Sequence, residues 1–123
     1  MATVASLVER FLQKERGAAN LLSPDAVTAQ ALAAASFYAG FAALEDEPVG
    51  ELDESVDLND SEWALIRPLF LLYVEREQAL QVEATAMMGV AGFGRTTSEI
   101  SGEIAQLERE MPRLAFSQPI ITV

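Results

Sequence analysis

The sequence predicts an all-α protein: a four-helix domain with a long kinked third helix, an acidic loop between helices two and three, and an extended C-terminal arm. Two observations predict this class. Apolar residues recur at helical spacing in successive segments, and residues that commonly cap helices stand just before three of them. The chain has 123 residues, the size of one domain. We therefore expect a helical domain over 1–111 and an interaction arm over 112–123.

The first helix is predicted over residues 4–16, because its apolar residues follow the spacing of one helix face. Those residues are Val4, Leu7, Val8, Phe11 and Leu12. Gly17 follows two basic residues, which is typical of a helix C-terminus. Ser6 and Glu9 have the spacing of a capping box, so the first residue of this helix stays open.

The second helix has a clear beginning and runs to about Leu44. Ser23 is a typical N-cap, and Pro24 suits the first helical position. Residues 26–44 contain no charged residue, so a membrane span has to be considered. The many alanines and the acidic flanks favour a helix buried in protein instead.

An acidic loop follows over residues 45–62, which hold nine of the nineteen acids and no base. Pro48 and Gly50 break helix, and a short strand or hairpin around 49–58 is left open. A calcium loop of the EF-hand type starting at Asp57 would need glycine at position 62 and glutamate at position 68. The sequence has Glu62 and Pro68 there, so we predict a solvated loop and no metal site.

The third helix is predicted to begin near Asp60 and to end near Met88. Asn59 and Glu62 have the spacing of a reciprocal cap. The run 63–74 is apolar nearly all round, which predicts burial on several sides.

Two features modify this third helix along its length. Pro68 lies inside the pattern and is expected to kink it. Beyond Val74 the apolar pattern narrows to one face, and we expect Leu80, Ala84 and Met87 to point inward.

The fourth helix is predicted to start at a capping box, Thr96 with Glu99, and to stop at Pro112. Its apolar residues repeat at four, three and four, which indicates a narrow seam against one partner helix. The seam residues are Ile100, Ile104, Leu107 and Met111.

The last twelve residues, PRLAFSQPIITV, are too apolar for a free tail. Each large apolar side chain gains about 1.5–3 kcal/mol on full burial. We expect this arm to lie on its own domain, on a neighbouring copy, or on another protein. The candidate interaction residues are Arg113, Leu114, Phe116, Pro119, Ile120, Ile121 and Val123.

Residues 89–96, GVAGFGRT, come within one letter of a phosphate-binding P-loop. Arg95 replaces the lysine, and the preceding residues have a helical pattern where a P-loop needs a buried strand. We interpret the segment as a connection between helices, in which Phe93 and Arg95 are candidate contact residues.

Composition excludes several functions. The chain has no cysteine and no histidine, which removes disulfides, histidine-dependent triads and nearly all zinc sites. We predict no catalytic residue, no cofactor and no enzymatic activity. The formal net charge of -11 opposes non-specific binding of nucleic acid.

Residues 61–84, SEWALIRPLFLLYVEREQALQVEA, and 93–123, FGRTTSEISGEIAQLEREMPRLAFSQPIITV, resemble small helical neck proteins of tailed bacteriophages. These are head-tail connector, adaptor or head-completion proteins. The resemblance implies a homo-oligomeric ring, usually dodecameric, between the portal protein and tail or collar proteins. DNA would pass through it without specific binding. It also implies assembly in the host cytoplasm, a final location in the virion neck, and no membrane contact.

Two alternatives remain open. A small cellular interaction module, such as an antitoxin, inhibitor or adaptor, accounts for the acidity and the apolar tail, and predicts no ring. A DNA mimic accounts for the charge. However, nearly half of the acids lie in one loop, and a mimic needs them in spaced rows along helices.

Overall fold

The computed structural model describes residues 2–15, 22–44, 52–86 and 97–116. The all-α prediction is confirmed. These ranges contain four α-helices and two very short strands. The elements are β1 (Ala2–Thr3), α1 (Val4–Arg10), the π-helical turn η1 (Phe11–Glu15), α2 (Pro24–Ala39), β2 (Asp57–Leu58), α3 (Asp60–Ala86) and α4 (Thr97–Phe116).

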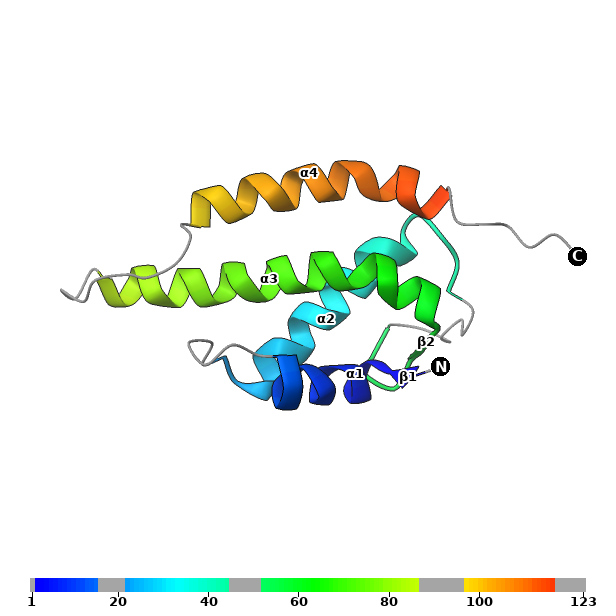
Figure 1. Ribbon diagram of the computed structural model, residues 1–123, viewed down its shortest axis with the longest axis horizontal. Helices are drawn as coiled ribbons and strands as arrows, with labels where there is room; N and C mark the ends of the chain where they lie inside the picture. The colour runs from blue at the N-terminus through cyan, green and yellow to red at the C-terminus, as the bar shows by residue number, and fades with distance from the viewer. Residues whose placement is uncertain (1, 16–21, 45–51, 87–96, 117–123) are drawn as a thin grey trace, which may run out of the picture.

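Helix α3 is the central element of the molecule (Figure 1). Helix α4 lies along one side of it and runs antiparallel, α1 lies on the other side, and α2 crosses α3 so that its C-terminal end comes near α4. The C-terminal part of α3 extends past α1 and α2, where α4 is its neighbour among the helices drawn (Figure 1). The body is therefore thick at the end where α3 begins, which also contains α1 and α2. It is thin at the opposite end, which α3 and α4 form (Figure 1).

Helix α1 begins at Val4, the first residue of the predicted range. Thr3 is the N-cap: its Oγ1 accepts the N–H of Ser6 at 3.1 Å, so the start that was left open is not at a Ser6–Glu9 capping box. Thr3 has the extended backbone that a cap needs because it belongs to β1. The helix then continues as a π-helical turn over Phe11–Glu15, so the predicted helix is present with a changed winding.

The short strand left open in the acidic segment is β2, and it pairs with the N-terminus of the chain. β1 and β2 are antiparallel, with Ala2 opposite Leu58 and Thr3 opposite Asp57. The N–H of Val4 also donates to the carbonyl of Val56 at 3.0 Å. This pairing holds the start of α1 against the start of α3.

Helix α2 starts as predicted and ends earlier. The Oγ of Ser23 accepts the N–H of Ala26 at 3.2 Å, and Pro24 is the first helical residue. The helix ends at Ala39 instead of near Leu44. Gly40 has low helix propensity, and past it the N–H of Phe41 donates to the carbonyl of Tyr38 at 2.9 Å, a tight final turn.

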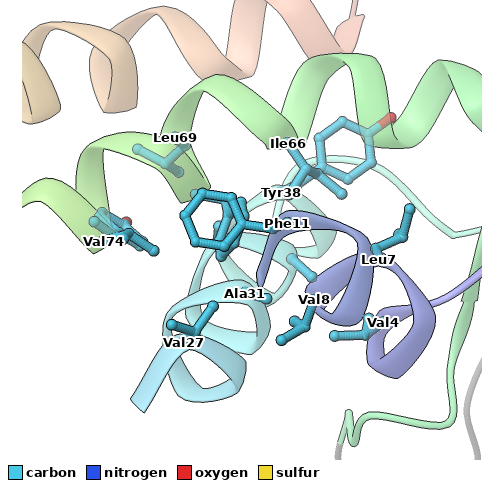
Figure 2. Packing of buried hydrophobic residues seen from close by; sticks show 14 of the residues in the cluster. Val4, Leu7, Val8, Phe11, Val27, Ala31, Tyr38, Ile66, Leu69 and Val74 are labelled. Atoms are coloured by element: carbon cyan, nitrogen blue, oxygen red, sulfur yellow. The ribbon is translucent and has the colours of Figure 1, made fainter. Parts of the chain in front are cut away.

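The core lies where α1, α2 and α3 meet (Figure 2). Phe11 from η1 stands at its centre, and its ring meets the Phe70 ring edge-on, with centroids 5.2 Å apart. On α2 the buried positions are mostly small, so α2 packs close to its neighbours. The buried residues of α2 are Val27, Ala31, Ala34, Ala35 and Tyr38.

Helix α3 begins with the predicted reciprocal cap. The N–H of Glu62 donates to Asn59 Oδ1 at 2.8 Å, and the N–H of Asn59 donates to Glu62 Oε1 at 2.9 Å. Pro68 lies inside the helix, which continues without a break to Ala86. Burial on several sides, predicted for 63–74, holds only in part. The fully buried residues Ile66, Leu69, Phe70, Tyr73 and Val74 share one face, and Leu65, Leu71 and Leu72 on the other sides are half-buried.

The prediction that Leu80 and Ala84 point inward is wrong, because both are exposed and Ala79 is buried instead. Met87, the third residue of that prediction, lies outside the described residues. This part of α3 has α4 as its neighbour and so has one covered face. Leu80 is one residue, about 100°, around the helix from Ala79 and falls outside that face.

Helix α4 packs on α3 through the predicted seam. Ile100, Ile104 and Met111 are buried, and Leu107 is half-buried against the core. Pro112 does not stop the helix, which continues to Phe116. A proline inside a helix removes one hydrogen bond at a cost of about 3 kcal/mol. The complete burial of Met111 next to it helps to offset that cost.

The predicted boundary at Pro112 is therefore wrong for residues 112–116, which belong to α4. The rest of the predicted arm, 117–123, lies outside the described residues.

Candidate functional site

The predicted interaction residues fall into two groups in the structure. Arg113 is exposed in the last turn of α4, and Leu114 and Phe116 also belong to this helix. The others lie outside the described residues, so the structure tests only part of the predicted set. They are Phe93, Arg95, Pro119, Ile120, Ile121 and Val123.

Helix α4 ends at the thick end of the body, beside the start of α3 (Figure 1). Any segment that follows Phe116 leaves from this end. The exposed guanidinium of Arg113 lies one turn before that point. A C-terminal arm that binds a partner would therefore start from the end of α4.

A polar cluster joins α3 to α4 near the middle of the pair. The hydroxyl of Tyr73 donates to Glu108 Oε2 at 2.9 Å. The guanidinium of Arg76 lies over the Tyr73 ring, 5.0 Å from its centre, in cation–π geometry. Burial raises the pKa of the Tyr73 hydroxyl, and the hydrogen bond to Glu108 raises it further. Tyr73 is therefore a neutral donor that holds the two helices together.

A second carboxylate joins the same helices at the thin end of the body. Glu83 Oε1, from α3, accepts the N–H of Thr97, the first residue of α4, at 2.8 Å. This bond satisfies one of the free N–H groups at the helix start, where a negative charge is favourable. The same N–H lowers the pKa of Glu83.

Glu62 is the buried carboxyl group of the core, with 4% of its surface exposed. It accepts the Asn59 N–H and so completes the cap of α3. Burial raises the pKa of nearby Tyr38, and the charge of Glu62 adds to this effect. The hydrogen bond to Asn59 gives this buried carboxyl group a structural role, the capping of α3.

The described residues contain no group of three or more histidine, cysteine, aspartate or glutamate side chains arranged to hold a metal ion. The ion pair between Arg67 of α3 and Glu15 of η1 is partly exposed and joins the two elements across the core. Such pairs contribute about 0–1 kcal/mol. In the described helices there is also no stretch long and apolar enough to cross a membrane.

Two large apolar side chains are exposed in the described residues: Phe41, which the sequence patterns did not single out, and Leu80, which they placed inward. Phe41 is 48% exposed just after α2, and Leu80 is 43% exposed on α3. The Phe41 ring meets that of half-buried Phe37 edge-on, with centroids 5.2 Å apart. The absence of charge over 26–44 was the available signal for Phe41, because an uncharged helix can have an uncharged outer face as well as a buried one.

Comparisons of this chain with protein-family models, with curated proteins and with solved structures find no match. A functional interpretation therefore depends on the surfaces of the chain itself: the end of α4, the acidic exterior, and the apolar side chains left exposed.

Proposed function

We propose that this protein is a structural subunit of the neck of a tailed bacteriophage, where copies form a ring between portal and tail. The observation that carries the proposal is the chain that follows α4. Residues 117–123 include Ile120, Ile121 and Val123 in only seven positions, and they continue from a helix end at the rim of the body. An apolar segment in that position is suited to bind a partner surface.

The charge of the chain supports the same role. With 19 acidic and 8 basic residues, the protein repels DNA phosphates. A ring of such subunits would let DNA pass without retaining it. A protein that bound DNA for regulation or packaging would need the opposite sign.

The helical body also suits a structural subunit. Glu62 caps α3, and Tyr73 and Glu83 join α3 to α4. These contacts make a stiff support for a binding segment, which is what an assembly protein needs.

Affinity capture of the tagged full-length chain from its native source, with mass spectrometry of the partners, tests the proposal. A chain ending at Phe116 removes 117–123 and leaves α4 whole. We expect portal and tail proteins with the full-length chain and none with the truncated one. Arg109→Ala, an exposed change on α4, is the control and should retain these partners.

Recovery of one cytoplasmic protein, or of a DNA-binding enzyme, would refute the neck proposal and favour a cellular module or a DNA mimic. Circular dichroism of the truncated chain separates binding from folding. If its helix content collapses, residues 117–123 belong to the core and are not an interaction arm.

A further inference from the structure

The outer face of α2 carries no charge beyond Asp25, which is exposed in the first turn. No acidic or basic residue occurs between Ala26 and Leu44, although the chain as a whole has a net charge of -11. The exposed positions on this face follow helical spacing and continue past the helix cap. They are Ala29, Ala33, Ser36, Gly40 and Ala43, with Phe41 beside them.

The other described helices differ from α2 past their first turns. There, each of them has exposed charged side chains: Glu9 and Arg10 on α1, Glu83 on α3, and Glu103 and Arg109 on α4. The uncharged face is therefore particular to α2 and is not a general property of the protein surface.

Large apolar side chains border the small ones on this face. Leu32 and Phe37 are half-buried along its sides, and Phe41 is 48% exposed at its end. The edge-on contact of Phe37 and Phe41 holds the exposed ring in one orientation. Small residues flanked by aromatic rings let another helix approach closely and bury apolar area.

We infer that this face of α2 is where a second copy of the same chain binds. Charge decides between occupants. Two copies that each carry a net charge of -11 repel each other wherever carboxylates come together. At physiological salt, screening limits this repulsion to charges within about 8 Å. A contact centred on Ala33 lies about 12 Å along the helix from Asp25, beyond that screening distance, so like-charged copies can meet there.

A foreign basic protein would be attracted elsewhere. Its positive groups would favour the acid-bearing faces, whereas the α2 face offers them no attraction. The inference deepens the proposed function and rests on it for its biological role. A ring needs contacts between subunits, and a contact through α2 would supply one kind of these contacts. The evidence for the α2 contact itself is the charge and exposure of that helix.

Sedimentation equilibrium of the purified full-length chain, over a wide concentration range, tests this inference. We expect a species heavier than the monomer. Ala33→Glu puts a carboxylate in the middle of the face and should weaken self-association by about tenfold or more, because like charges at an interface cost several kcal/mol. Phe41→Ser removes the exposed ring and should weaken it as well.

Ala105→Glu is the matched control, because it adds the same charge to an exposed alanine on α4. It should leave self-association unchanged, and circular dichroism should show native helix content for every variant. A wild-type chain that is monomeric throughout, or equal effects of Ala33→Glu and Ala105→Glu, would overturn the inference. Self-association through α2 without portal or tail partners would instead refute the neck proposal alone.

Discussion

The two halves of α3 belong to one continuous helix, but they differ in how many neighbouring helices pack against them. Residues 60–74 lie among α1, α2 and α4, and five of their apolar side chains are buried. Past Val74, Ala79 is buried, whereas Leu80, Gln81, Glu83 and Ala84 are exposed. The difference teaches that burial on α3 depends on how far its neighbours extend.

Helix lengths account for the difference. α3 has 27 residues and spans about 40 Å, whereas α2 has 16 residues and spans about 24 Å. Because α2 covers only part of α3, the C-terminal part of α3 at the thin end is held by α4. Stability is therefore concentrated at the thick end, and the thin end provides surface.

The largest expected effect comes from truncating the same residue type in each half. Leu69 is fully buried and Leu80 is 43% exposed. Leu69→Ala should lower the free energy of unfolding by about 2–5 kcal/mol, because it leaves a cavity in a packed core. Leu80→Ala should change it by less than about 0.5 kcal/mol. Urea unfolding of both variants, compared with wild type, measures the contrast.

Equal losses in the free energy of unfolding for Leu69→Ala and Leu80→Ala would contradict this contrast, because the thin end would then be as important to folding as the core. Ile66→Val is a milder control at the thick end, since Ile66 is also fully buried. It should cost about 0.5–1.5 kcal/mol, between the two leucine variants.

A smaller effect is expected at the border between the halves, where Tyr73 donates to Glu108. Tyr73→Phe should cost about 1–2 kcal/mol, because the bond to a charged group is lost while the ring stays packed. A double-mutant cycle with Glu108→Gln isolates this bond. If the two changes add without coupling, the hydrogen bond contributes nothing to holding α4.

The same tyrosine has a pH signature. Its pKa is raised in the folded state, so its contribution is complete below the unfolded value of about 10 and is lost as pH rises through the folded value. Wild type should therefore lose more stability than Tyr73→Phe in alkali, as measured by urea unfolding above that pH.

Local sequence patterns correctly predicted the helix caps that depend on residues close together in the sequence. The caps at Ser23 and at Asn59 with Glu62 depend on residues three apart, and all were correctly predicted. The Thr3 cap depends on pairing with Asp57, which is far away in the sequence, so a local pattern missed it. The exposure of Leu80 depends on how far α1 and α2 extend along α3, which no pattern within α3 contains.

The candidate site was harder to predict for a similar reason. Pro112 is a strong stop signal, yet α4 passes it where Met111 is buried, and this moves the start of any arm beyond Phe116. The uncharged segment 26–44 was visible in the sequence. Only the packing of α2 shows which of its residues are left outside.

The smallest expected effect lies at the thin end, where Glu83 caps α4 through the N–H of Thr97. That N–H lowers the pKa of Glu83. The stabilising contact is therefore fully present above the unfolded pKa of about 4.3, and it is lost as pH falls through the lower folded value. Hydrogen exchange in the first turn of α4 should then accelerate, while amides in residues 66–74 of α3 stay protected.

Nuclear magnetic resonance measures this directly through the Thr97 amide shift. We expect the shift to titrate with a midpoint below that of a free glutamate, and the titration to be absent in Glu83→Gln. That variant keeps a carbonyl oxygen that can accept the N–H, so α4 should remain folded, and exchange in its first turn should no longer respond to pH over this window. A midpoint at or above the free value would show that Glu83 does not cap α4. Equal acceleration in residues 66–74 would show that both halves of α3 open together, so the contrast between them would not extend to their dynamics.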